Sequence, residues 1–187
     1  MKTRLFSIAR YKLSISVLII FLVAVEMNAK PMYLQDSVLR RIKWEDGYKE
    51  AVIGEAYNYG LKNLIDKAKA VTWWKESAKK KHPLGIYNLG FAYSVGYGYN
   101  LERDSVKAEK YYIQAFPGVK SLAERGDLVA QSDLGDMYFG AQGVPQNLPE
   151  AVKWYRKAAE QGYAPALYGL GLAYLYGQKV ECARTFV

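Results

Sequence analysis

The chain of 187 residues is 51% hydrophobic and 24% charged, which provides a buried core and excludes a chain left disordered by low hydrophobicity. Its single cysteine, Cys182, and single histidine, His82, exclude an intramolecular disulfide, a cysteine metal cluster and a two-histidine zinc site, so we expect no metal or cofactor. The formal net charge is +8, but residues 1–29 carry four basic residues and one Glu, which leaves the remaining chain only mildly basic, at about +5.

Residues 1–29 have the layout of a secretory signal peptide. Four basic residues precede an apolar stretch over residues 13–25, and a short polar segment follows up to Ala29. The stretch is shorter than the roughly 20 residues that a membrane-spanning helix needs. We therefore predict export, into a periplasm or out of the cell, with cleavage after Ala29. Met27 occupies a position where cleavage favours a small residue, so an uncleaved membrane anchor stays open as the alternative.

Four copies of the pattern aliphatic-Gly-x-x-Tyr follow, at Ile53–Tyr57, Leu89–Tyr93, Leu134–Tyr138 and Leu170–Tyr174. Their glycines are 36 residues apart in the first and last intervals and 45 apart in the middle one. Self-similarity at such a period indicates a repeat architecture. We divide the chain into a signal peptide (1–29), an N-terminal lead-in (30–46), repeat 1 (47–82), repeat 2 with insertions (83–126), repeat 3 (127–162), a partial repeat 4 (163–180) and a non-repeat tail (181–187).

A second shared element follows the first in repeats 1 to 3. In repeat 3 it spans residues 151–159, where the apolar residues recur at the spacing of an amphipathic helix. Residues 70–78 and 108–115 match it. Each repeat is therefore predicted to be an antiparallel pair of helices. The nine extra residues of repeat 2 are expected in loops, seven of them near Pro117-Gly118.

The first helix of each pair carries the recurrent glycine. A glycine inside a helix costs about 1 kcal/mol relative to alanine, so its recurrence indicates close approach of the partner helix. Glycines that can end the first helices follow at Gly96, Gly140 and Gly177. The predicted fold is all-α, an α/α superhelical solenoid of antiparallel helix pairs.

Repeat 3 closely resembles the Sel-1-like repeat family, a relative of the tetratricopeptide repeats. The resemblance extends over about residues 47–180 and is weakest in repeat 1, where Lys62 replaces a loop glycine. It implies an adaptor that binds other proteins, often in the bacterial envelope, and that is not an enzyme. Some secreted members are associated with β-lactam binding or hydrolysis; they are rich in cysteine, unlike this chain, and we keep that activity as the alternative. The matching residues are Ala130, Leu134-Gly135, Tyr138, Gly143-Val144, Ala151, Trp154-Tyr155, Lys157-Ala158-Ala159 and Gln161-Gly162.

If the repeats stack as in tetratricopeptide arrays, the positions three before, one after and four after each framework glycine line an inner groove. These positions mix aromatic with polar side chains, which suits a protein or peptide partner. The candidate partner-binding residues are Tyr87, Phe91, Ser94, Ser132, Asp136, Phe139, Tyr168 and Leu172. The equivalent positions at the two ends of the array are Ala51, Glu55, Asn58 and Leu175.

Other conspicuous residues have structural interpretations. The framework tyrosines, Tyr57, Tyr93, Tyr138 and Tyr174, and the tryptophans Trp73, Trp74 and Trp154 lie on apolar stripes and are expected in the core. The basic run Lys79-Lys80-Lys81-His82 fits a solvated helix end, so we expect no nucleic-acid binding. The last helix shows apolar residues with no helix after it to cover them. We expect either a truncated array or self-association through this end.

Overall fold

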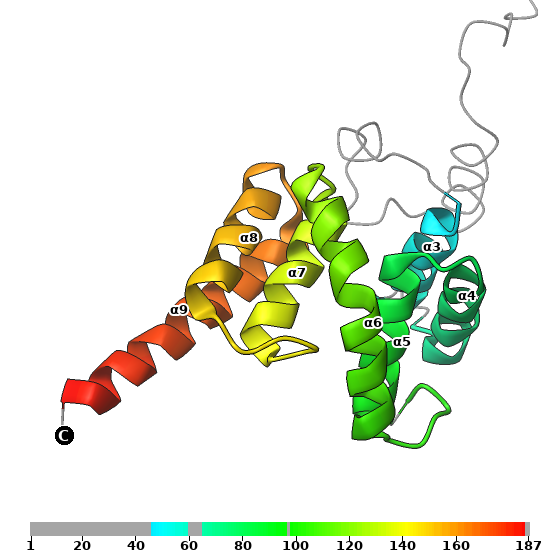
Figure 1. The fold of residues 1–187 in the computed structure, drawn as a ribbon, viewed down its shortest axis with the longest axis horizontal. Helices are drawn as coiled ribbons and strands as arrows, with labels where there is room; N and C mark the ends of the chain where they lie inside the picture. Colours follow the sequence, from blue (N-terminus) through cyan, green and yellow to red (C-terminus); the bar gives the residue numbers. More distant parts are fainter. Residues whose placement is uncertain (1–45, 60–64, 97, 186–187) are drawn as a thin grey trace, which may run out of the picture.

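The computed structural model describes residues 46–59, 65–96 and 98–185. Within these ranges the chain forms seven helices and no strand (Figure 1). The predicted all-α fold is therefore confirmed. The predicted signal peptide lies outside the described residues. The helices are α3 (Tyr48–Tyr59), α4 (Lys67–Lys79), α5 (Pro83–Val95), α6 (Ser105–Glu124), α7 (Leu128–Gly140), α8 (Leu148–Glu160) and α9 (Ala164–Thr185).

The helices stack in chain order, each packed against the one before it and the one after it (Figure 1). The first helices of the repeats are α3, α5, α7 and α9, and the second helices are α4, α6 and α8. Contacts also join α3 to α5 and α7 to α9, so the first helices touch within each of these two pairs. This is the arrangement of an α/α superhelical solenoid, in which each repeat buries its apolar face against its neighbours.

Four helices begin at a side chain that caps their free backbone N–H groups. Asp66, Asp104, Asp127 and Asn147 each accept a hydrogen bond from the backbone nitrogen three residues later, at 2.8 to 3.1 Å. Asp and Asn are preferred at this position because their oxygens replace the missing intrahelical acceptors. The sequence therefore sets where α4, α6, α7 and α8 start.

The recurrent glycine lies against an aromatic ring in each of the first three repeats, as predicted. A Cβ at Gly90 would lie 2.8 Å from the Tyr112 ring, and one at Gly135 would lie 2.6 Å from the Tyr155 ring. Gly54 faces Trp74 even more closely. A methyl group cannot fit at such distances, which explains why glycine is kept despite its cost in a helix.

The extra residues of repeat 2 lengthen a helix, which corrects the prediction of a loop near Pro117. Helix α6 runs through Pro117 and Gly118 and ends at Glu124. Its added turns bury Val119 and Leu122 in the main core, and Gly118 leaves room for Pro83 at the start of α5. The apolar face of these turns offsets the backbone hydrogen bond that a proline removes from a helix.

One of the three predicted helix ends differs from expectation. Gly96 ends α5 with a positive φ of 70°, as predicted. Helix α7 ends at Gly140, also as predicted, and its C-cap residue Ala141 is in the left-handed conformation. Helix α9 continues through Gly177 to Thr185 and extends beyond the other helices (Figure 1). A glycine only permits a helix to end, and among the described residues nothing turns the chain there.

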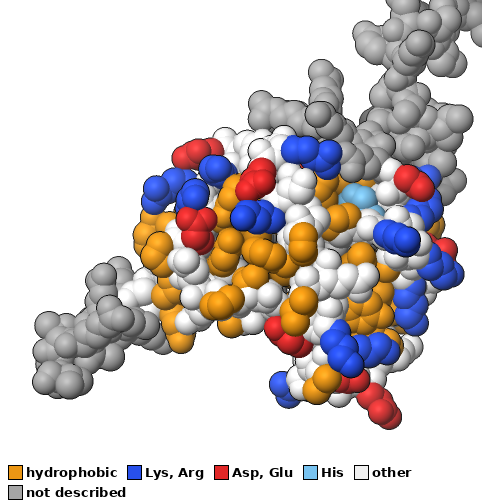
Figure 2. Space-filling view, in the orientation of Figure 1, with side chains coloured by type: hydrophobic (Ala, Val, Ile, Leu, Met, Phe, Trp, Pro, Cys, Tyr) orange, Lys and Arg blue, Asp and Glu red, His pale blue; other side chains and the backbone are white. Residues whose placement is uncertain are grey.

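The aromatic residues follow the predicted core with two exceptions, Tyr174 at the C-terminal end and Trp73, which is only partly buried and belongs to neither core cluster. Trp74 and Trp154 are buried, and Tyr57, Tyr93 and Tyr138 are partly buried against the core clusters. Tyr174 is instead 47% exposed, because the described residues include no second helix to cover α9. Hydrophobic side chains gather near the middle of the face shown in Figure 2, with Lys and Arg mainly toward its edges.

Candidate functional site

Carboxyl groups from two first helices come close enough to influence each other on one side of the solenoid. Glu55 of α3 is partly buried, and burial together with the charge of Asp136 on α7 raises its pKa to about 8. A contact with the Asn88 side chain of α5 partly offsets this shift. We define the α3–α5–α7 face by side chains of these three helices: Glu55, Asn88, Phe91, Ser94, Asp133, Asp136 and Phe139. It places negative charge where water is scarce, which disfavours ionisation.

A third carboxyl group, that of Asp133, belongs to the same face. Burial raises its pKa well above the usual value, and the charges of Glu55, Asp136 and Asp127 act in the same direction. The Oδ2 atom of Asp133 is buried and makes no hydrogen bond within the described part of the chain. A buried polar atom of this kind costs stability unless something satisfies it. The face is therefore electrostatically suited to a positively charged group.

Hydroxyl groups of tyrosines hold this face in place. Burial raises the pKa of Asp136 from 3.8 to about 6. Tyr155 of α8 donates a hydrogen bond to this carboxyl group, and the bond keeps the pKa from rising further. The Tyr99 hydroxyl donates to Asn58 Oδ1 at 2.6 Å. The Tyr112 hydroxyl donates to Ser94 at 3.3 Å. These bonds tie polar first-helix positions to the elements behind them.

Not all of the predicted groove residues are accessible. Tyr87 and Ser132 are each only 4% exposed, which corrects the prediction that they line an open groove. The Tyr87 ring packs against the Tyr112 ring at an interplanar angle of 43°, and its hydroxyl donates a hydrogen bond to Gln142, which follows α7. The binding role of these two residues is therefore withdrawn.

The other predicted residues divide between two surfaces. Phe91, Ser94, Asp136 and Phe139 are partly exposed on α5 and α7, and they lie on the α3–α5–α7 face. Tyr168 and Leu172 are exposed on α9. Their role in binding a partner stays a prediction.

Sequence reasoning missed two members of this face, Asn88 and Asp133. Asp133 lies three residues before Asp136, and residues at that spacing share one side of a helix. The spacing therefore indicated that Asp133 lies beside Asp136. The predicted groove nevertheless included only the positions three before, one after and four after each framework glycine, and Asp133 is two before Gly135. Tyr99 was not singled out from the sequence either, although its ring packs edge-on against Phe91 and its hydroxyl donates a hydrogen bond to Asn58.

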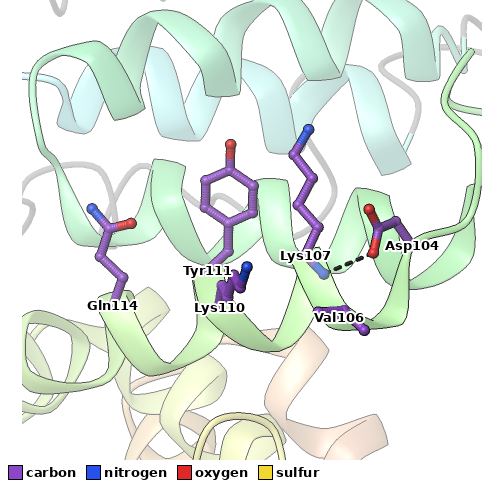
Figure 3. Close-up of a pocket in the computed structure, with 6 residues that line it drawn as sticks. All are labelled: Asp104, Val106, Lys107, Lys110, Tyr111 and Gln114. Carbon is purple, nitrogen blue, oxygen red and sulfur yellow. Dashed lines mark hydrogen bonds between the residues drawn. The ribbon is translucent and has the colours of Figure 1, made fainter.

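A shallow hollow of about 450 Å³ lies along one side of α6 (Figure 3). Asp104, Val106, Lys107, Lys110, Tyr111 and Gln114 line it. Lys107 is engaged within the protein, since its ammonium group bonds the Tyr93 hydroxyl at 2.8 Å and lies over the Tyr93 ring. Tyr111 stacks on that ring with an interplanar angle of 10°. Because all lining residues come from one helix and its cap, this hollow assembles no catalytic group of converging side chains.

The basic run is only partly solvated. Lys80 pairs with Asp46 at 2.8 Å and with Glu50 at 3.1 Å, and these bonds raise its pKa. His82 is buried at the N-cap of α5, with its ring edge-on to Tyr48, which corrects the prediction of a solvated helix end at this residue. Proline at the next position explains why the helix boundary falls there.

Within the described ranges, no group of three His, Cys, Asp or Glu side chains could hold a metal ion. In the same part of the chain, no helix combines the length and the apolarity needed to cross a membrane. The predictions of no cofactor and no metal stay predictions.

The antiparallel helix pairs, the repeated glycine–aromatic contacts and the polar inner positions define a helical-repeat protein. The Sel1 repeat model matches residues 51–82, 83–116, 128–163 and 164–181. The chain belongs to the Sel1 repeat family, as its resemblance to the Sel-1-like repeats predicted. Proteins of this family generally mediate protein–protein interactions and are typically non-catalytic scaffolds.

The chain is similar to proteins from distant sources. It is 34% identical over 149 residues to an F-box protein of Arabidopsis thaliana, covering 79% of this chain and 35% of the relative. It is 35% identical over 71 residues to a sel1-like repeat-containing protein of Acanthamoeba polyphaga mimivirus, covering 38% and 13%. The chain thus spans about a third or less of the length of these relatives.

Two solved structures are also similar. A Sel1 repeat protein from Oxalobacter formigenes is 30% identical, with a TM-score of 0.40, covering 70% of this chain and 49% of that one. A protective antigen of uropathogenic Escherichia coli with an SLR fold is 31% identical, with a TM-score of 0.40, covering 70% and 26%.

Proposed function

We propose that this Sel1 repeat protein is an exported scaffold whose α3–α5–α7 face binds a protein segment that carries a basic side chain. The observation that carries the proposal is the closeness of Glu55, Asp133 and Asp136. Burial raises the pKa of all three carboxyl groups, and the charge of Asp136 raises the pKa values of Glu55 and Asp133 further. An incoming ammonium or guanidinium group relieves that repulsion and favours the ionised carboxyl groups. Charge complementarity of this kind sets specificity and association rate.

Aromatic side chains next to the carboxyl groups supply apolar contact for the same segment. Phe91 and Phe139 are partly exposed on α5 and α7, and Ser94 adds a hydroxyl group between aromatic neighbours. Interfaces obtain most of their binding energy from a few such aromatic and charged anchors. A segment with a Lys or Arg flanked by apolar residues matches this face.

The experiment is a binding assay of the full chain with matched peptides in which a central Lys is retained or replaced by norleucine or Glu. We expect binding of the Lys peptides only, with weaker binding as salt increases. Asp136→Asn should weaken binding about tenfold or more, consistent with loss of a partly buried charge partner. Glu160→Gln, at an exposed residue of α8, is the control and should bind as the parent does. Equal binding of the Lys and norleucine peptides would exclude a charge-directed site.

We also propose that residues 1–29 direct export and are removed after Ala29. The basic start and the short apolar stretch support this proposal. Mass spectrometry of the protein recovered from producing cells tests it. A mature chain that starts at Lys30 is the expected result, and an intact N-terminus in the membrane fraction would favour the uncleaved anchor.

The exposed end of α9 supports a second proposed association, between two copies of this chain. No observation within the described residues favours β-lactam binding or hydrolysis, and we do not propose it.

A further inference from the structure

Helix α9 has one packed side and one bare side within the described part of the chain. Ala166 and Ala173 are buried, and Gly169 lies against the Tyr155 ring. The residues on the opposite side are exposed, including Leu167 at 59%, Tyr168 at 73% and Leu175 at 54%. We call this opposite side the α9 face; it consists of Leu167, Tyr168, Gly171, Tyr174 and Leu175.

The centre of the α9 face is an open notch at Gly171. A Cβ built there would meet no atom within 4 Å, whereas the equivalent glycines of the first three repeats each lie against an aromatic ring. The α9 face therefore matches, in register, the faces that α3, α5 and α7 use for packing. It has the shape to receive an aromatic ring beside Gly171 and lacks one in the described residues.

The sequence around this notch is nearly the same in both directions. Residues 167–175 read Leu-Tyr-Gly-Leu-Gly-Leu-Ala-Tyr-Leu, and only Gly169 and Ala173 break the symmetry about Gly171. Two copies of such a helix placed antiparallel, with a two-fold axis at Gly171, bring Tyr168 of each copy to Tyr174 of the other. Leu167 of each copy then meets Leu175 of the other. A two-fold dimer requires this self-complementarity, because one patch contacts itself.

We propose that two copies of the chain pair antiparallel through their α9 faces, with the two Gly171 residues at the crossing point. This inference rests on the self-association proposed above and adds its partner, register and orientation. The tyrosine rings fill the space beside each Gly171, as the rings of Trp74, Tyr112 and Tyr155 do within the repeats. Arg156 of α8 already holds the Tyr174 hydroxyl at 2.6 Å, so this ring is oriented before the copies meet.

Disulfide cross-linking tests the register and orientation. In full chains that carry Cys182→Ser, one copy has Tyr168→Cys and the other has Tyr174→Cys. Antiparallel pairing brings these two cysteines together, whereas two copies of Tyr168→Cys stay roughly 9 Å apart along the helix axis, too far for a disulfide. We expect the mixed pair to cross-link and each variant alone to remain uncross-linked. Cross-links within the single-variant samples, or none in the mixture, would overturn the proposal.

Light scattering of the full chain tests the pairing itself. We expect the parent to be a dimer and Gly171→Arg to be a monomer with unchanged helical circular dichroism, because this arginine meets nothing within one copy but blocks the crossing. Gly177→Arg is the matched control. Gly177 also has no neighbour within 4 Å, but it lies six residues on, roughly 240° around the helix from Gly171, and its variant should remain dimeric.

Failure of this proposal is separable from failure of the proposed function. A parent chain that is monomeric at every concentration, or a Gly171→Arg variant that remains dimeric, overturns the pairing through α9. Peptide binding at the α3–α5–α7 face is measured in the same variants. It should be unchanged by Gly171→Arg and weakened about tenfold or more by Asp136→Asn, which should remain dimeric.

Discussion

The Tyr155 hydroxyl donates a hydrogen bond to Asp136 Oδ1 at 2.6 Å, while the ring of the same tyrosine lies against Gly135, the residue before that aspartate. One side chain of α8 therefore both packs α7 and stabilises a carboxylate of the α3–α5–α7 face. The packing of a repeat and the charge of its binding surface are coupled through this residue.

Tyr155→Phe separates these two roles. The ring contact with Gly135 is kept, but Asp136 loses the hydrogen bond that lowers its pKa, so its pKa should rise above about 6. We expect the free energy of unfolding at neutral pH to fall by about 1–3 kcal/mol. Urea unfolding and an NMR titration of the Asp136 carboxyl group measure the two effects. An unchanged pKa in the variant would contradict this role of the bond.

The two glycines Gly135 and Gly171 should respond oppositely to the same substitution. Gly135→Ala places a methyl group 2.6 Å from the Tyr155 ring and should destabilise the protein by about 1–3 kcal/mol. Gly171→Ala meets nothing within 4 Å and should stabilise α9 by up to about 1 kcal/mol through helix propensity. Thermal unfolding of both variants, measured under conditions where the chain is monomeric, provides the comparison. Equal effects would mean that helix propensity alone decides both positions.

The stability of the protein should fall as the pH rises through the neutral range. The pKa of Glu55 is raised from 4.5 to about 8, so the folded chain holds a proton that the unfolded chain has released between these values. Its contribution is complete below pH 4.5 and is lost as the pH approaches 8, with Asp136 adding a similar loss between 3.8 and about 6. While one carboxyl group titrates, the slope is roughly 1.4 kcal/mol per pH unit at most.

Urea unfolding at several pH values, with Glu55→Gln beside the parent, measures this slope. The variant cannot ionise at position 55, so its stability should be nearly independent of pH between 6 and 8 if Glu55 is responsible. A variant with the same slope as the parent would assign the pH dependence to other groups.

Pro117 should be a correctable defect in α6. It lies inside the helix on an exposed side and removes the backbone hydrogen bond to the carbonyl of Ile113. Pro117→Ala should therefore raise the free energy of unfolding by about 1–3 kcal/mol. Pro149→Ala is the control, because Pro149 lies in the first turn of α8, where no intrahelical bond is lost. Thermal unfolding that ranks the two variants equally would contradict this explanation.

The repeats were predictable from sequence because their signals are local. The glycine spacing, the apolar stripe of residues 151–159 and the capping residues each act within one or two helices, and the structure follows them. The extension of α6 was not predictable in this way. A proline normally marks a helix boundary, and only the burial of Val119 on the core shows why the helix continues.

The candidate site was predictable only in part because its geometry depends on how far the solenoid turns. Tyr87 and Ser132 share a register position with the exposed Tyr168 of the last repeat, yet both are buried. The contact between Tyr48 of α3 and Asp127 at the start of α7 has the same origin. Neither relationship follows from the pattern within one repeat.

The closeness of repeats 1 and 3 has an electrostatic consequence. Contacts in a solenoid run mainly between adjacent repeats, yet Glu55 in repeat 1 senses the charge of Asp136 in repeat 3. Coiling the array brings like charges together, so each carboxyl group that loses its proton favours a more open coil. A bound cation has the opposite effect and favours a tighter one. The pitch of the superhelix is thus a quantity on which a rise in pH and a basic partner act in opposite directions.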